Sequence, residues 1–152
     1  MPELAETVDV DAPPERVWAA LTDWSRQGEW MLATHVAPVI GPARGTGGRL
    51  AAVTGLRLPG GRRLGVLDTM EITRWEPPTR VDVLHTGRLV RGSGVFEIRP
   101  RGGHSTFVWI EQLDLPLGAV GRLGWPAVEP VMRAGVRRSL RRFAEFARTY
   151  SG

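Results

Sequence analysis

Two acids and a histidine have the clearest capacity for chemistry in this sequence: Asp68, His85 and Glu111. Each falls in a segment where apolar and polar residues alternate, as they do along a β-strand. If the faces that carry them point inward, the three side chains share one cavity, with Arg88 or Arg91 at its edge. An imidazole beside carboxylates can move protons in a cyclisation or a dehydration, and Glu111 is the leading candidate for the general acid or base.

A second interpretation assigns no chemistry to these residues. Glu111 is then a carboxylate at the rim or on the surface, and His85 and Arg88 lie at an exposed turn around the His-Thr-Gly sequence of residues 85–87. Residues in turns are usually solvated. The alternating pattern does not decide between the two interpretations, because both faces of the strand around Glu111 carry apolar residues.

Metal and nucleophile chemistry have no support in the sequence. The chain has no cysteine, and its histidines, His35, His85 and His104, lie in different segments without the paired spacing of a metal site. The glycine-rich residues 45–48 lack the ending of a phosphate-binding loop, and residues 92–94 lack the first glycine of a nucleophile elbow. We therefore expect no metal, no cofactor and no nucleophilic residue.

The elements that would position the three residues follow from the apolar pattern and its breaks. Residues 4–11 alternate like a half-buried strand, and Pro13 and Pro14 open a short amphipathic helix. Gly28 interrupts the helical pattern, and a second short helix ends near Trp30. From residue 34 to about residue 115, six strands are separated by Gly- and Pro-rich turns, a spacing that favours consecutive antiparallel pairing.

A long final helix follows Pro116. Its apolar stripe is spaced by three or four residues and consists of Val128, Met132, Val136, Leu140, Phe143 and Ala147. Trp125 and Pro126 are expected to break the chain just before this helix, which would suit a gate. The order of elements predicts one α+β domain over residues 1–152, in which an antiparallel sheet curves around the helix. The space between sheet and helix is the natural ligand site.

Several stretches resemble the START-like superfamily, also called SRPBCC, which includes polyketide cyclase/dehydrase and lipid-transport-like proteins. They are VDVDAPPERVWAALTDWSRQGEW (8–30), EITRWEPPTRV (71–81), GSGVFEIRP (92–100) and GGHSTFVW (102–109). They occur in the same order as in that family, so the match covers essentially the whole chain. The resemblance implies a helix-grip fold, a curved seven-stranded antiparallel sheet around a long C-terminal helix, with a deep apolar pocket.

The resemblance also implies which side chains line the pocket, because in that fold Phe107, Trp109 and Glu111 would face inward. The expected wall consists of Trp109, Phe107, Met70, Phe96, Val128 and Met132, with Trp30, Met31 and Trp125 near the mouth. Trp24 borders the mouth or packs in the core. Trp18, at helical spacing, is expected to pack in the core.

Three functions remain open. The first is binding of a small hydrophobic or amphipathic ligand, such as a lipid, a polyketide or a quinone-like molecule. The second is a polyketide aromatase/cyclase-like enzyme that uses a pocket carboxylate. The third is a toxin-like protein directed at RNA or ribosomes through the arginines of the last helix: Arg133, Arg137, Arg138, Arg141, Arg142 and Arg148. The simpler explanation of these arginines is a solvated helix face.

Composition indicates which partners and which cellular location to expect for the protein. All 20 basic residues are arginine, which we attribute first to GC-rich codon usage, and a net charge of +4 is modest for a dedicated nucleic-acid-binding protein. No apolar run is long enough to span a membrane, and residues 1–10 lack the parts of a signal peptide. We therefore expect a cytoplasmic protein whose partner is a small hydrophobic ligand, without membrane insertion or nucleic acid, and homodimerisation is left open.

Overall fold

The computed structural model describes residues 2–152, including every side chain in that range except those of residues 40, 57 and 63. The elements follow the predicted order of strand, two short helices, six strands and long helix. They are β1 (Glu3–Val10), α1 (Pro14–Leu21), the 3-10 helix η1 (Trp24–Glu29), β2 (Thr34–Ile40), β3 (Arg49–Arg57), β4 (Arg63–Glu76), β5 (Arg80–Thr86), β6 (Arg91–Arg101), β7 (His104–Leu113) and α2 (Ala119–Arg148).

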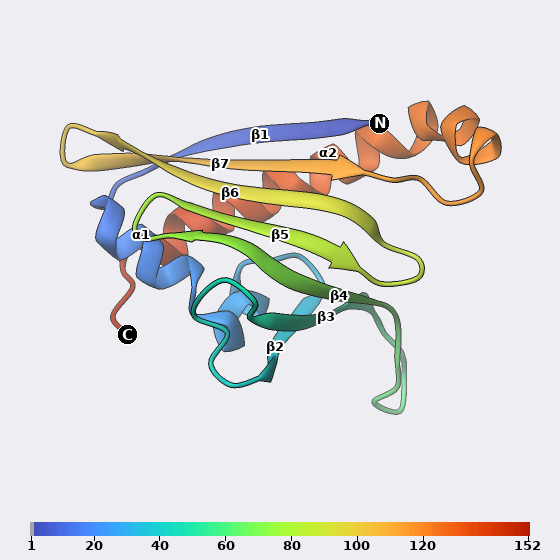
Figure 1. The fold of residues 1–152 in the computed structure, drawn as a ribbon, viewed down its shortest axis with the longest axis horizontal. Helices are drawn as coiled ribbons and strands as arrows, with labels where there is room; N and C mark the ends of the chain where they lie inside the picture. The colour runs from blue at the N-terminus through green and yellow to red at the C-terminus, as the bar shows by residue number, and fades with distance from the viewer. Residues whose placement is uncertain (1) are drawn as a thin grey trace.

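The strands form one seven-stranded antiparallel sheet in the order β1-β7-β6-β5-β4-β3-β2. Strands β2 to β7 pair consecutively because short turns connect them. β1 lies at the opposite edge, paired with β7. Figure 1 shows the sheet curving across α2, which runs along one of its faces. The predicted α+β helix-grip fold is therefore confirmed. No helix among the described residues is both long and apolar enough to cross a membrane.

The two short helices pack against the end of the sheet through their apolar side chains. α1 begins at Pro14, which suits the first turn because its missing N–H would have no helical partner there. Its buried side chains include Trp18, whose ring meets the edge of Trp75 on β4 at a centroid distance of 4.9 Å. Trp24 of η1 is buried as well, and its Nε1–H donates to the carbonyl of Ala43 at 2.9 Å. Both tryptophans anchor helix to sheet.

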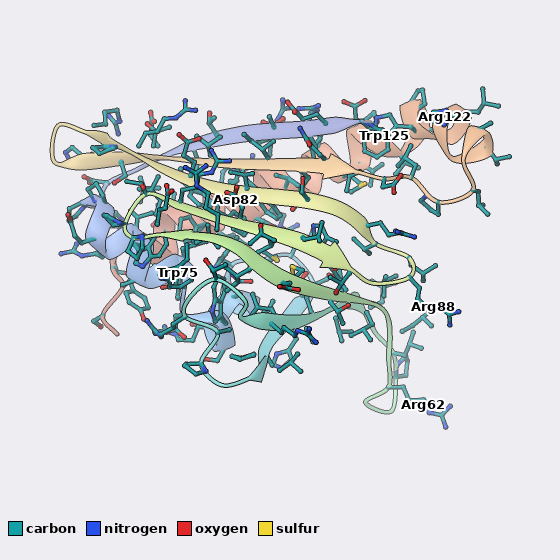
Figure 2. The ribbon with its side chains drawn as sticks, in the orientation of Figure 1. Arg62, Trp75, Asp82, Arg88, Arg122 and Trp125 are labelled. Carbon is teal, nitrogen blue, oxygen red and sulfur yellow. The ribbon has the colours of Figure 1, made fainter. Side chains whose placement is uncertain are left out.

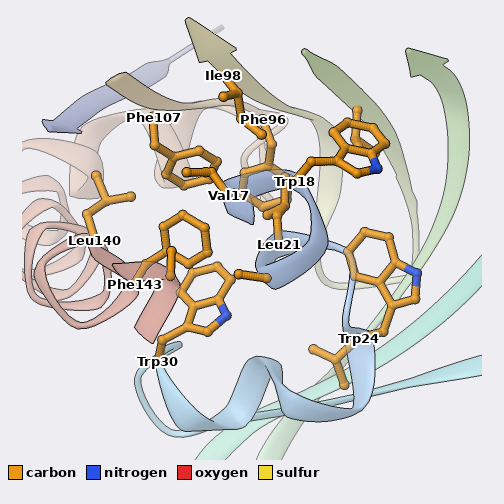
Figure 3. Close-up of a cluster of buried hydrophobic side chains, with 14 of the residues drawn as sticks. Val17, Trp18, Leu21, Trp24, Trp30, Phe96, Ile98, Phe107, Leu140 and Phe143 are labelled. Atoms are coloured by element: carbon orange, nitrogen blue, oxygen red, sulfur yellow. The ribbon is translucent and has the colours of Figure 1, made fainter. Parts of the chain in front are cut away.

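The fully buried apolar contacts that hold α2 to the sheet lie in its second half. The side chains of Leu140, Phe143 and Ala147 are buried, and the Phe143 ring lies 4.5 Å from the Phe107 ring and 4.8 Å from the Trp30 ring, between centroids (Figure 3). Figure 1 shows the first turns of α2, in orange, extending past the start of β1. The predicted stripe therefore divides into a packed second half and a largely exposed first half.

The predicted break at Trp125 and Pro126 is wrong. α2 begins at Ala119, and both Pro126 and Pro130 lie inside it. A proline inside a helix removes one backbone hydrogen bond and costs about 3 kcal/mol. The helix tolerates two of them here because this half is largely exposed, so water can satisfy the freed carbonyl groups.

The same substitution at two positions of α2 tests this division. We expect Leu140→Ala to lower the free energy of unfolding by about 2–5 kcal/mol, because Leu140 is 1 % exposed and its removal leaves a cavity. Leu123→Ala should change it by less than about 0.5 kcal/mol, because Leu123 is 82 % exposed. Urea unfolding of both variants measures the difference. Equal losses of unfolding free energy at the two positions would contradict the finding that the buried apolar contacts of α2 lie in its second half.

Candidate ligand-binding site

A cavity of about 480 Å³ lies between the sheet and the middle of α2. Its wall comes from η1, the loop that follows it, all seven strands of the sheet and α2, and most of its side chains are apolar. The lining residues are Leu4, Trp24, Gln27, Met31, Leu32, Thr34, Val36, Leu50, Ala52, Thr54, Val66, Asp68, Met70, Val83, His85, Val90, Phe96, Trp109, Glu111, Leu113, Val131, Met132, Gly135, Val136 and Ser139.

One group of charged residues interrupts this wall, formed by Asp68 on β4, His85 on β5 and Glu111 on β7. We call it the Asp–His–Glu trio. Nδ1 of His85 lies 2.9 Å from both carboxylate oxygens of Asp68, and Nε2 lies 3.0 Å from Oε2 of Glu111. The Nε1–H of Trp109 donates to Oε1 of Glu111 at 2.8 Å. Because each ring nitrogen faces a carboxylate, the arrangement suits an imidazolium that donates from both sides.

His85 is buried, with 8 % of its surface exposed, and does not lie at an exposed turn. Burial of the ring disfavours its charged form. The hydrogen bonds and negative charges of Asp68 and Glu111 outweigh this effect and raise the pKa of His85 from 6.5 to about 10. Arg88 is the residue that lies exposed in the turn, and neither Arg88 nor Arg91 lines the cavity.

A glycine on β6 makes the contact between His85 and Glu111 feasible, although β6 lies between their strands. Gly94 pairs with Val83 on one side and with Glu111 on the other, so all three share the inward face. A Cβ atom at position 94 would lie 2.9 Å from Oε1 of Glu111 and 3.1 Å from Cγ2 of Val83. The absence of a side chain at Gly94 therefore leaves the space that the Glu111 carboxylate occupies.

Five of the nine expected ligand-binding residues line the cavity: Met31, Met70, Phe96, Trp109 and Met132. The other four do not. Phe107 and Trp30 are fully buried in the aromatic cluster around Phe143, which fills the space that a ligand would need. Trp125 and Val128 lie on the first half of α2, which extends beyond the cavity.

Several lining residues on the strands and on α2 were not predicted from the sequence. Val83 on β5 shares a face with His85 in the alternating pattern, and this pairing was the signal for its role. Gly135 and Ser139 lie one turn from Met132 and Val136 of the apolar stripe, so helical spacing could have found them. Gly94, which leaves room for Glu111 without lining the cavity, had a weaker signal, a glycine in the interior of a strand.

The cavity opens to solvent between the loop before β2, the start of β4 and α2, where the lining residues Leu32, Val66 and Val131 are exposed. Figure 2 shows Arg62 and Arg88 at the same end of the molecule as the start of α2. Both side chains are exposed and outside the lining. Arg62 and Arg88 therefore stand outside the cavity.

The arginines of α2 form a separate surface. Arg133 pairs with Glu6 and Glu129, and Arg137 also pairs with Glu6. Arg138, Arg141 and Arg142 line a shallow hollow together with Glu29, Glu145, Phe146, Arg148 and Thr149. Part of the predicted arginine face thus fastens α2 to β1, and acidic side chains interrupt the rest.

Within the part of the chain that the structure describes, no group of three or more histidine and acidic side chains is arranged to hold a metal ion. In the trio, both ring nitrogens of His85 are already engaged by carboxylates. The trio is therefore arranged for hydrogen bonding within the cavity wall.

The raised pKa of His85 makes stability depend on pH. Because folding raises this pKa, the stabilisation is fully present below about pH 6.5 and is lost as pH rises toward 10. We expect the free energy of unfolding to fall over this range more steeply in the native protein than in His85→Gln. The exposed His35, changed to Gln, is the matched control. NMR titration of the ring measures the pKa directly, and a midpoint near 6.5 would contradict this geometry.

Solved structures that resemble this chain cover nearly its whole length. Protein TTHA0849 from Thermus thermophilus has a TM-score of 0.75 and 21 % identity, over 99 % of this chain and 100 % of that one. A protein from Arthrobacter aurescens has a TM-score of 0.72 and 14 % identity, over 99 % and 88 % of the chains. The Aha1 dimer from Colwellia psychrerythraea has a TM-score of 0.67 and 14 % identity, over 100 % of both. At these identities the likeness shows the fold alone.

The family of the chain follows from its sequence. No curated protein matches it. The sequence profile of the polyketide cyclase/dehydrase and lipid-transport family matches residues 1–148, which is nearly the entire chain, and the sheet order and long helix described above agree with the fold expected of such a member. The chain therefore belongs to the polyketide cyclase/dehydrase and lipid-transport family, a family of the START-like or SRPBCC type.

Proposed function

We propose that this protein binds a small hydrophobic or amphipathic molecule in the cavity between its sheet and α2. The observation that carries the proposal is the cavity itself. Its volume of about 480 Å³ falls within the range of small-molecule sites, about 300–1,000 Å³. Its wall is apolar except at a few positions, which is the composition that such sites share. A ligand would bury its apolar body against this wall and gain free energy in proportion to the area removed from water.

The position of the cavity along α2 supports the same proposal. The aromatic cluster around Phe143 fills the space under the second half of the helix, whereas small side chains leave space under its middle. Gly135 and Ser139 on α2 face Ala52 and other residues of the sheet across this space. Met31, Met70 and Met132 add flexible side chains, which adapt to ligands of irregular shape.

A bulky side chain at Gly135 should block the cavity. A Cβ atom there would have only Leu32 within contact distance, at 3.7 Å, so the backbone accepts it and the rest of the side chain must enter the cavity. We expect Gly135→Phe to weaken binding of the neutral dye N-phenyl-1-naphthylamine by about tenfold or more. Dye fluorescence measures the affinity, and thermal unfolding reports whether the variant folds.

Gly124 provides the matched control on the same helix. A Cβ atom at position 124 would meet no atom within 4 Å, and Gly124 lies outside the cavity. Gly124→Phe should therefore bind the dye as the native protein does. If the two variants bind equally well, the dye does not occupy this cavity and the proposed function is wrong.

A second candidate function is acid–base catalysis on a cyclisable polyketide-like substrate, because the trio lies in the cavity wall. With a pKa of about 10, His85 keeps its proton near neutral pH and is poorly suited to accept one. In an enzyme, His85 would position Glu111, and Glu111 would exchange a proton with the substrate. Catalysis therefore depends on one carboxylate, whereas ligand binding depends on the whole wall.

Glu111→Gln separates the two candidates, because it keeps the size of the side chain and removes its acid–base capacity. If the protein cyclises a linear poly-β-ketone, we expect this variant to lose about a hundredfold or more in kcat while its dye affinity stays within about twofold. Product formation is followed by ultraviolet absorbance of the aromatic ring. If turnover is undiminished in the variant, Glu111 is not the catalytic acid or base, and acid–base catalysis in this cavity is not supported.

A further inference from the structure

We infer that the cavity selects ligands whose inner end is a hydrogen-bond donor, neutral or cationic, such as a hydroxyl, a phenol or an amine, and that it disfavours carboxylate-bearing ligands. This inference rests on the proposed function and specifies the chemical class of ligand. It follows from three properties of the cavity wall: a surplus of acceptors, the absence of arginine among the lining residues that the structure describes, and the greater exposure of the two acids to the cavity.

The trio has more acceptor sites than donors. Two carboxylates offer about eight lone-pair sites. Three N–H groups point at them, two from the His85 ring and one from the Trp109 indole. A ligand that donates a hydrogen bond therefore finds unused acceptors on Asp68 or Glu111, and such bonds to charged oxygens are stronger than those between neutral groups.

The donors in the wall are mostly engaged elsewhere. The Nε1–H of Trp24 donates to the Ala43 carbonyl, and Nε2 of Gln27 donates to the Leu21 carbonyl. Apart from the trio, the polar lining residues that remain are hydroxyl-bearing and uncharged: Thr34, Thr54 and Ser139. The Nε1–H of Trp30 is buried without a partner among the described residues, but Trp30 lies outside the lining. Both ring nitrogens of the His85 imidazolium are engaged by the acids, and the other described lining residues offer a carboxylate ligand no cationic donor.

The net charge of the cavity is opposite to that of the protein. The chain carries 20 arginines and a net charge of +4, yet none of the described residues that line the cavity is an arginine. Two carboxylates and one imidazolium sum to a charge of −1. A second negative charge in this partly enclosed, apolar space would be repelled and would lose its hydration without compensation.

The two acids are more exposed to the cavity than the imidazolium is. The side chains of Asp68 and Glu111 are 17 % and 13 % exposed, whereas that of His85 is 5 % exposed. His85 is enclosed between the two acids, so its positive charge holds them in place and a ligand meets their oxygens first. A donor group at the inner end of the ligand fits this surface.

Four naphthalene compounds with the same apolar body test the inference: 1-naphthylmethylamine, 1-naphthalenemethanol, 1-methylnaphthalene and 1-naphthoate. Their affinities are measured at pH 7 by displacement of N-phenyl-1-naphthylamine. We expect the amine and the alcohol to bind more tightly than the hydrocarbon, and the amine to bind at least about tenfold more tightly than the carboxylate. At this pH the amine carries a positive charge and the carboxylate a negative one.

Two variants test whether the Asp–His–Glu trio causes the preference for amine over carboxylate ligands. Asp68→Asn removes one negative charge and should reduce the ratio of amine to carboxylate affinity by about threefold or more, with little effect on 1-methylnaphthalene. Asp114→Asn makes the same change in total charge at an exposed residue outside the cavity and should leave the ratio unchanged. If Asp68→Asn does not fold, Glu111→Gln provides the same comparison.

The outcomes separate the inference from the proposed function. Carboxylate binding as tight as amine binding in the native protein would overturn the inference, because the head group would then lie at the arginines outside the cavity. Equal ratios in Asp68→Asn and Asp114→Asn would overturn it too. If 1-methylnaphthalene fails to bind, or binds equally well to Gly135→Phe, the cavity is not a ligand site and the proposed function itself is wrong.

Discussion

The attachment of α2 to the sheet through its second half is the constraint on which the rest of the structure depends. Phe143 packs between the rings of Phe107 and Trp30, and this cluster sets the distance between helix and sheet at one end. Toward the other end, Met132, Gly135 and Val136 line the cavity. A protein interior is otherwise packed as densely as an organic crystal, so a space of this size requires such a rigid support beside it.

The polar trio depends on the same sheet in a different way. Its members come from β4, β5 and β7, and they meet because Gly94 on the intervening strand β6 has no side chain. Burying two carboxylates would be unfavourable without the imidazolium between them and the indole N–H of Trp109. The result is an acidic point in an apolar wall, inside a protein whose surface is rich in arginine. The inferred selectivity for hydrogen-bond donors follows from this difference between a negatively charged cavity and an arginine-rich surface.

Much of the fold and part of the site could be predicted from the sequence. Strand alternation grouped Asp68 and His85 with apolar residues of their strands, the family resemblance placed Glu111 on the inward face of its strand, and all three line one cavity. Helical spacing was less informative, since the stripe of α2 continues unchanged from the exposed Val128 to the buried Leu140. Trp30 and Met31 are neighbours, yet one lies in the core and the other lines the cavity. Such differences depend on tertiary packing, which no local pattern contains.

Methyl NMR of the methionines tests most directly whether ligands occupy this cavity. Three of the four methionines, Met31, Met70 and Met132, line the cavity from three different elements of the structure. With ¹³C-labelled methionine methyl groups, assigned by single Met→Leu variants, we expect 1-naphthalenemethanol to shift all three resonances along one binding curve. That curve should give the same Kd as dye displacement. Binding of the compound with all three resonances unchanged would show that it binds elsewhere, and would contradict ligand binding between the sheet and α2.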